Sequence, residues 1–302
     1  MNIPLLKKLV TGFNSCLKQP KYQRLPFKEN LSINDLMDSE QVIINRSGNS
    51  RLSQLFFRNY IPQSRKRVYH HFTSLAAFKG IIESEKLWLS CVSKRFGEKE
   101  FKPFYKAHKM DGYEKRETKM GIPLDQEICN NSFFLSLTGN DIDSDTEDHL
   151  AIAFSENRKG VKLVFRITKV KTDLRKVYYP ADPKHPEIGL LKDFNNITRQ
   201  EDFYLIFEGL SKFGFFYLPG LLSNEEEYRL LISRGKALGN KFEFEENADN
   251  YEFIKIPLFT NPLCEIKLTK VVLFDDSVEN DVIEILKRNP KFSNVEVERK
   301  LK

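Results

Sequence analysis

Apolar residues recur along the chain with two different periods, and these periods predict where strands and helices lie. In residues 75–82 the apolar side chains recur at helical spacing, which predicts an amphipathic helix. These side chains are Leu75, Phe78, Ile81 and Ile82. Ser74 or Thr73 can cap the N-terminus of this helix. Short apolar or alternating runs predict the strands of the chain instead. These expected strands are 68–73, 87–90, 132–138, 161–167 and 225–232.

The remaining segments are less regular. Residues 1–67 alternate short apolar runs with polar breaks, which predicts short helices followed by an exposed linker, "QSRKRV". Residues 92–130 are charged and irregular and predict an insertion with one or two helices. An acidic turn is expected at residues 139–149 and a short helix at residues 149–157. A further helix is expected around residues 199–213. From residue 268 onward the pattern predicts a strand, a helix and a strand.

Helices and strands therefore alternate irregularly, and the chain has no glycine-rich turn between a strand and a helix. This argues against a doubly wound nucleotide-binding fold and favours a mixed α+β domain. At 302 residues and 40% hydrophobic composition, the chain is long enough to bury a sizeable core. We expect a basic, mainly helical N-terminal extension at residues 1–67 and one main domain at residues 68–302.

The charge of the chain is concentrated at its N-terminus. Residues 1–28 contain no acidic residue and carry +6, which equals the net charge of the whole chain. This basic arm could contact nucleic acid or an anionic surface, or it could be a solvated leader. Its cationic residues are Lys7, Lys8, Lys18, Lys21, Arg24 and Lys28.

The sequence also bears on compartment and metal binding. No apolar run approaches the ~20 residues that span a bilayer, and no secretory signal is evident, so we expect a cytoplasmic protein. Four widely spaced cysteines suggest reduced thiols and no zinc site. The carboxylates of residues 141–148 alternate as in an EF-hand, but Thr146 and Ile152 occupy the positions that need glycine and glutamate. We therefore expect no metal.

Two expected strands carry candidate chemistry. In the first, Tyr69, His71 and Thr73 share one face, and His70 lies on the other with Val68 and Phe72. His71 and Thr73 then form a short polar edge.

In the second, the same alternation puts Glu225, Glu227 and Arg229 on one face. The two carboxylates would be about 6.5–7 Å apart, and Arg229 would keep Glu227 ionised. An ionised glutamate can stabilise an oxocarbenium-like sugar cation and hold a ribose hydroxyl.

These segments together resemble a known family. The run "HHFTS" before a helix and "LWLS", the segments "FFLSLT" and "LAIAFSENRKGVKLVF", the motif "EEEYRLLI" and the ending "LTKVVLFDD" are similar to an uncharacterised bacterial domain-of-unknown-function family. That family has a Tyr-His-Tyr-Thr-Ser-like strand and a Glu-x-Glu-Trp-Arg strand, and it in turn resembles the ADP-ribosyltransferase superfamily. The resemblance covers roughly residues 68–302.

The resemblance implies a fold and a site. The fold would be a pair of packed, mostly antiparallel β-sheets with flanking helices around an NAD cleft. His71 matches the histidine that binds a ribose of NAD, and Thr73 flanks the nicotinamide pocket. Glu227 matches the catalytic glutamate, and Glu225 is the upstream member of a Glu-x-Glu pair, which in some transferases orients the acceptor.

The remaining implied cofactor-binding residues are Tyr69, Ser136, Thr138 and Phe154. Ser136 or Thr138 falls on the middle strand. Ala151 and Phe154 stand where the family has a tryptophan and a tyrosine, and "RFGEKEF" stands where it usually has Asn-Asp-Pro.

The implied activity is NAD-dependent transfer of ADP-ribose to a macromolecular acceptor, with NAD as co-substrate, as in a bacterial toxin or antiviral-defence effector. The alternative is a non-enzymatic binding module with an inert cleft, which recruits nucleic acid or protein through the basic arm.

Overall fold

The chain folds into two compact units. The computed structural model describes residues 2–23, 25, 30–39, 42–45, 57–58, 61–95, 101–179, 186–207, 209–218, 225–248 and 250–300. Unit 1 comprises Met1–Gln63, Phe96–Asn130 and Val177–Gly220, and unit 2 comprises Ser64–Arg95, Asn131–Lys176 and Leu221–Lys302. The sequence pattern predicts one division of the chain, after residue 67, whereas each of these units collects three segments of the chain.

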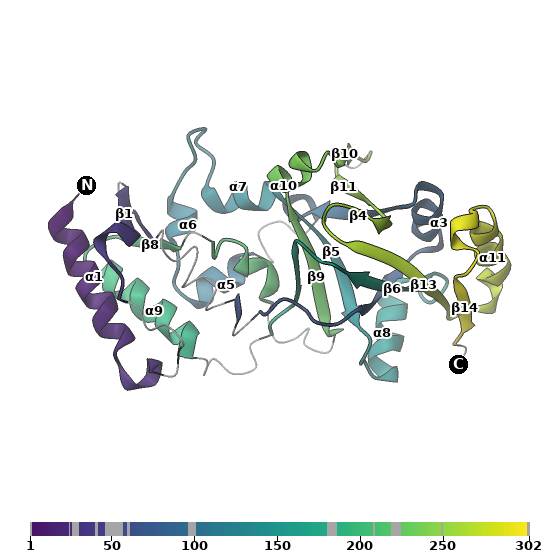
Figure 1. Cartoon of the computed structure of the whole chain (residues 1–302), viewed down its shortest axis with the longest axis horizontal. Coiled ribbons are helices and arrows are strands. Elements are labelled where there is room, and N and C mark those ends of the chain that lie inside the picture. The colour runs from purple at the N-terminus through teal and green to yellow at the C-terminus, as the bar shows by residue number, and fades with distance from the viewer. Residues whose placement is uncertain are drawn as a thin grey trace. The chain divides into compact units, whose positions relative to one another are not determined.

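In unit 1, helix α1 (Ile3–Leu17) packs beside helix α9 (Pro186–Arg199), as Figure 1 shows. The side chain of Asn2 caps α1 by accepting a hydrogen bond from the Leu5 backbone N–H at 3.1 Å. Phe13 is fully buried and stacks on Phe194, with ring centroids 4.4 Å apart. The other helices of unit 1 described here are α5 (Lys102–Ala107), α6 (Gly112–Lys115) and α7 (Leu124–Asn130).

Unit 1 also has a small sheet. Strand β1 (Leu36–Ser39) pairs antiparallel with β2 (Val42–Asn45), and β2 pairs parallel with β8 (Tyr204–Phe207). The expected helix at residues 199–213 is therefore wrong, because α9 ends where it was to begin. The run "YLIF" is short and β-prone, and a parallel partner distant in sequence satisfies its backbone.

Unit 2 contains most of the predicted strands. Helix α3 (Leu75–Ser84) begins as predicted, with Ser74 accepting from the Ala77 N–H at 3.0 Å. The strands that form its large sheet are β3 (Val68–Thr73), β4 (Lys86–Cys91), β5 (Ser132–Gly139), β6 (Val161–Thr168), β7 (Asp173–Lys176), β9 (Glu227–Ser233), β10 (Glu243–Glu246), β11 (Glu252–Pro257), β12 (Phe259–Thr260), β13 (Glu265–Leu273) and β14 (Glu296–Arg299). Its helices are α3, α4 (Val92–Arg95), α8 (Ser144–Phe154), α10 (Arg234–Gly239) and α11 (Glu279–Lys287). The mixed α+β class is confirmed.

Strand β5 joins the two halves of this sheet. Along one edge it pairs with β9 over Ser132–Thr138. On the other edge, β4 pairs only with Phe133 and Phe134, and β3 pairs only with Thr138 and Gly139. The ladder is thus interrupted between these pairings. Strands β11 and β10 continue the sheet beyond β4, and β6 and β13 continue it beyond β3. Among the described strands of the large sheet, every pairing is antiparallel except that of β13 with β14.

The core of unit 2 lies on one face of this sheet. Tyr69, Leu137 and Tyr228 belong to one apolar cluster that also includes buried residues of α3 and α11. These two helices pack side by side (Figure 1). On the opposite face, Phe72 of β3 packs with Leu150 of α8 in a second, smaller cluster. The two faces of β3, β5 and β9 are therefore distinguishable.

Helix α8 starts earlier than the sequence suggested. Asp143 caps it by accepting from the Thr146 N–H at 2.7 Å, so the second half of the acidic segment forms its first turns. Carboxylates in a first turn are stabilised by the helix dipole, which explains the acidic residues without a metal. Within the described ranges, no cluster of three or more histidine, cysteine or acidic residues could hold a metal ion.

The sequence also makes predictions about membrane-spanning segments and about the state of the cysteines. Among the described residues, none of the helices combines the length and apolar character that crossing a bilayer requires. The four cysteines are free and buried. Burial raises the pKa of the Cys16 thiol to about 12, and the neighbouring Asp193 carboxylate adds to this effect.

Candidate functional site

Three neighbouring strands of unit 2 bring four of the nine candidate residues together. Thr138 of β5 lies opposite His70 of β3 on one side and opposite Glu227 of β9 on the other. Ser136 lies opposite Arg229. Directly opposed residues of an antiparallel ladder point to the same face. His70, Thr138 and Glu227 therefore form a polar row across the three strands, with Ser136 and Arg229 beside it.

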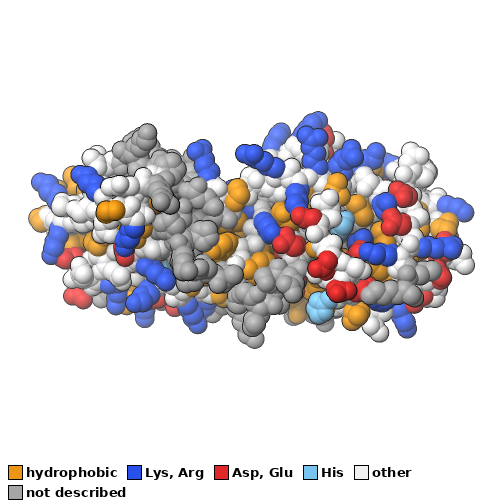
Figure 2. Space-filling view, turned by 90° about the horizontal axis from the view of Figure 1, so that it is seen from below, with side chains coloured by type: hydrophobic (Ala, Val, Ile, Leu, Met, Phe, Trp, Pro, Cys, Tyr) orange, Lys and Arg blue, Asp and Glu red, His pale blue; other side chains and the backbone are white. Residues whose placement is uncertain are grey.

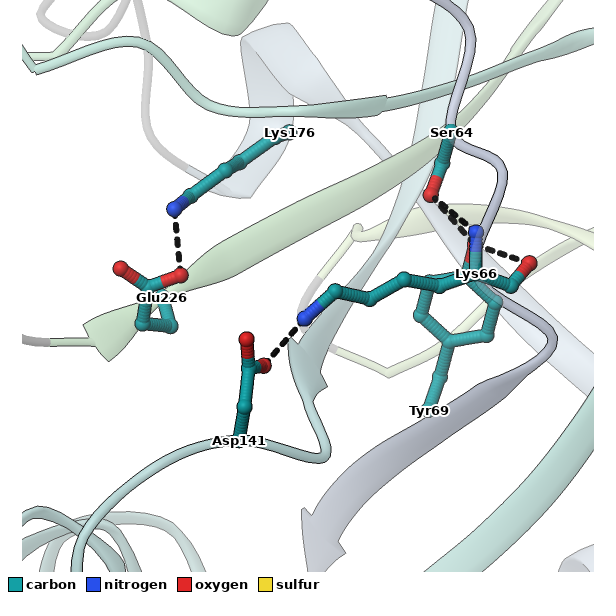
Figure 3. Close-up of polar contacts among 6 residues, drawn as sticks. All are labelled: Ser64, Lys66, Tyr69, Asp141, Lys176 and Glu226. Carbon is teal, nitrogen blue, oxygen red and sulfur yellow. Dashed lines mark hydrogen bonds and ion pairs between the residues drawn. The ribbon is translucent and has the colours of Figure 1, made fainter.

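Tyr69 lies on the other face of the sheet. Its ring is fully buried and meets Tyr228 edge to face, with centroids 5.4 Å apart. Its hydroxyl donates to the Lys66 carbonyl at 3.0 Å and shares a hydrogen bond of 2.7 Å with the Ser64 hydroxyl (Figure 3). Tyr69 is thus a satisfied core residue, and it does not point with Glu227.

Glu227 and Arg229 form a buried ion pair, as the alternation of β9 predicts. Arg229 Nε donates to Glu227 Oε1 at 2.9 Å, and Nη2 donates to Oε2 at 3.1 Å. Glu227 is 5% exposed and Arg229 is 2% exposed. The Arg229 guanidinium also stacks over the Phe134 ring, 4.6 Å from its centroid. The pair is rigidly held, because two N–H groups of the Arg229 guanidinium bond to the carboxylate and one face of the guanidinium packs on the Phe134 ring.

Glu225 does not share this arrangement. β9 begins at Glu227, and Glu226 has φ +46°, in the left-handed region, so extended alternation stops before Glu225. The expectation that Glu225 and Glu227 share one strand face is therefore wrong. Glu226 forms an ion pair with Lys176 (Figure 3), and its carbonyl accepts from the Gly139 N–H at 3.2 Å.

His71 occupies the interruption in the ladder of β5. Its Nδ1 lies 3.0 Å from the Ser136 carbonyl oxygen. Because a carbonyl only accepts, Nδ1 carries a proton in this contact. Ser136 lies between the residues of β5 that pair with β4 and those that pair with β3. In an uninterrupted sheet its carbonyl would accept a hydrogen bond from a neighbouring strand. Here the imidazole of His71 occupies that position instead. Both residues are partly exposed.

The remaining predicted residues lie around this region of unit 2. Thr73 ends β3 opposite Val161 and is 7% exposed. Thr138 is also 7% exposed. Phe154 is the last residue of α8 and is 49% exposed, so its ring is available on the surface.

Sequence reasoning missed a buried charged group beside His70. Lys162 of β6 and Lys300 both bind Glu147 of α8, which is 5% exposed. Burial alone would raise the pKa of Glu147, but the two ammonium groups more than offset it and lower this pKa. The sequence feature that could have revealed this buried group is Lys162, a lone cation inside the apolar run "VKLVF".

His70 is held neutral by these surroundings. Burial lowers its pKa to about 4, the Lys162 charge contributes, and the Glu147 carboxylate opposes the shift. None of the residues that the structure describes bonds to its buried Nδ1. The sequence analysis had considered only a core or rim role for His70.

A further ion pair of unit 2 involves Lys66. Its ammonium binds Asp141 (Figure 3). The same ammonium lies over the Tyr228 ring, 5.3 Å from its centroid. The Lys66 ammonium lowers the pKa of Asp141. On the face seen in Figure 2, acidic, basic and histidine side chains are intermingled over the right-hand part of the molecule.

The basic arm is partly neutralised within unit 1. Lys8 binds Glu201 at 2.7 Å, and Lys21 binds Asp193 at 2.6 Å. Tyr22 also donates to Asp193 at 2.8 Å. The helical part of the arm is docked and is not a loosely packed leader, whereas Arg24 and Lys28 lie outside the described residues.

Comparison of the chain with protein-family models, with curated proteins and with solved structures gives no match. The resemblance found in the sequence motifs is therefore a hypothesis, and the argument for a function depends on the residues of unit 2.

Proposed function

We propose that the chain is an NAD-dependent ADP-ribosyltransferase whose catalytic glutamate is Glu227. The observation that carries the proposal is the arrangement around β5. One edge of this strand holds the Glu227–Arg229 pair on β9, and the interrupted stretch of the other edge receives the His71 ring at Ser136. This chemistry requires a glutamate and a histidine, and here both flank one strand. The alternation of β3 nevertheless puts His71 on the face of Tyr69 and Leu163, and Glu227 lies on the opposite face with His70 and Thr138.

The state of Glu227 supports its role. Each carboxylate oxygen accepts one hydrogen bond from Arg229 and has a further lone pair for a ribose hydroxyl. A carboxylate in a site with little water interacts strongly with positive charge that develops at the anomeric carbon. Arg229 pairs with this carboxylate and fixes its direction.

NAD is the co-substrate in this proposal. His71 would anchor the dinucleotide, Thr73 would shape the nicotinamide pocket, and Ser136 or Thr138 would line it. Bond cleavage releases nicotinamide, and the ribosyl carbon then bonds to the acceptor. Because Glu227 is only 5% exposed, the site excludes most water, and this favours transfer to an acceptor over hydrolysis.

The residues that the resemblance adds fit the proposal unequally. Phe154 is exposed and can contact a ligand at the surface, whereas Tyr69 is sealed in the core and acts only by supporting β3. Glu225 lies just before β9, where it could orient an acceptor but not share the ribose with Glu227.

The test is incubation of the full chain with NAD labelled in the adenylate moiety and, separately, in nicotinamide. We expect nicotinamide release, with adenylate label retained on a macromolecule when cell extract is added as acceptor. Release without retention would indicate hydrolysis and contradict the transferase assignment. No release with protein, RNA and DNA acceptors would support the inert binding module instead.

A further inference from the structure

Unit 1 has a surface pocket whose lining includes none of the residues of the NAD proposal. It has a volume of about 380 Å³, which is within the range of small-ligand sites. The end of α5 and the turn after it form one wall, and the end of α9 forms the other. Its lining residues are Lys106, Lys109, Asp111, Asn195, Asn196 and Arg199.

The charge in this pocket is not balanced. Lys106, Lys109 and Arg199 contribute three cations against the single carboxylate of Asp111. Within the part of the chain that the structure describes, none of these cations forms a salt bridge, whereas Lys8 of the same unit pairs with Glu201. The pocket therefore favours an anionic ligand.

Arg199 is already oriented. Its guanidinium lies over the ring of Tyr204, 4.1 Å from the centroid. Stacking on an aromatic ring holds the planar group and leaves its N–H edge for an anion. An arginine fixed in this way recognises phosphate oxygens better than a mobile lysine, because two parallel N–H groups match the oxygen spacing.

Asn195 adds a second requirement. It is 1% exposed, and its Nδ2 donates to the Lys109 carbonyl. That carbonyl fixes the orientation of the amide, because it cannot donate. The Oδ1 atom is buried, and none of the described residues donates to it. A buried acceptor without a donor is unfavourable, and a ligand O–H or N–H would remove this cost.

We propose that this pocket binds a small phosphorylated compound, a nucleotide or a sugar phosphate, whose hydroxyl or amine group donates to Asn195. The cations hold the phosphate, and the buried amide selects the adjoining part of the ligand. The carbonyl ends of α5 and α9 carry partial negative charge, which offsets some of the attraction. We therefore expect moderate affinity, with a Kd on the order of 0.1–1 mM.

Ligand-observed NMR titration of the full chain tests this site with four probes: AMP, ribose 5-phosphate, inorganic phosphate and adenosine. We expect AMP, ribose 5-phosphate or both to bind at least about tenfold more tightly than phosphate or adenosine, and added salt to weaken binding. Which of the two binds identifies the source of the ligand. Phosphate or adenosine binding as tightly as both would overturn the proposal, as would the absence of binding.

Substitutions at two exposed lining residues test the site without disturbing the fold. Arg199→Gln and Lys109→Gln should each weaken binding about tenfold, while Lys119→Gln, an exposed lysine outside the pocket, should not. Equal binding by all three variants would assign the signal to another site. Nicotinamide release plays no part in this readout, so the proposal for Glu227 can fail without affecting it.

Discussion

The buried pair of Glu227 and Arg229 is the strongest local feature of the candidate site. Its geometry was predictable from sequence, because residues two apart in a strand share a face whatever the rest of the fold does. The place of Glu225 was not predictable, since it depends on the left-handed backbone of Glu226. Nor was the Lys66–Asp141 pair, whose partners are 75 residues apart.

Removing one partner of this pair should be costlier than removing both. Arg229→Met leaves a buried carboxylate unpaired and is expected to lower the free energy of unfolding by about 3–5 kcal/mol. The double variant Glu227→Gln/Arg229→Met has no unpaired charge and should lose less. Chemical denaturation followed by circular dichroism measures both; a double variant less stable than Arg229→Met alone would show that the pair is not coupled.

The neutral state of His70 predicts a pH dependence. Its pKa is about 4 in the fold and about 6.5 when unfolded, so the unfolded chain binds the extra proton first. His70 thus stabilises the fold fully above pH 6.5, and this contribution is lost as pH falls from about 6.5 to 4. His108, whose pKa burial also lowers to about 4, acts in the same window.

Denaturation midpoints measured between pH 7 and pH 4.5 test this assignment. Most of the carboxylates stay ionised there, so the histidines dominate the slope. His70→Asn should flatten the pH dependence, while His149→Gln, an exposed position on α8, should leave it unchanged. A slope that His70→Asn does not alter would mean that burial and the Lys162 charge do not hold this imidazole neutral.

At the scale of elements, local pattern was sufficient where an apolar period was long and bounded. This holds for α3, β5 and β6, whose boundaries the sequence predicts within a few residues. The local pattern failed to predict β8. Its run of four apolar-rich residues is compatible with a helix or a strand, and pairing with the distant strand β2 determines that it is a strand. The local pattern also failed for α8, whose cap lies inside an acidic run that we interpreted as a turn.

The docking of α1 makes a prediction about unit 1. Phe13→Ala removes a fully buried ring that stacks on Phe194, and large-to-small substitutions of this kind cost about 3–5 kcal/mol. Thermal unfolding should show a clear decrease in the midpoint of unit 1. Lys7→Gln, on the exposed side of α1, is the control and should leave the midpoint nearly unchanged.

At the scale of the whole molecule, the sequence predicts the class but not the division of the chain. Unit 1 collects three separate segments of the chain. Helix α1 packs on α9, and β2 pairs with β8, although the partners are far apart in sequence. Such pairing leaves no local pattern. The interruption along β5 is invisible in sequence for the same reason, since it arises from how β3 and β4 share one edge.

The central claim is that the carboxylate of Glu227 cleaves the nicotinamide bond of NAD. The most direct measurement is the rate of nicotinamide release by wild type, Glu227→Gln and Glu226→Gln, each first confirmed to be folded. Glu226 is the matched control, because it is the adjacent glutamate and pairs with Lys176. We predict release by wild type and Glu226→Gln, and a reduction of at least about a hundredfold for Glu227→Gln, as expected when a charge-stabilising group is lost. Equal rates for all three proteins, or no release by any, would contradict the claim.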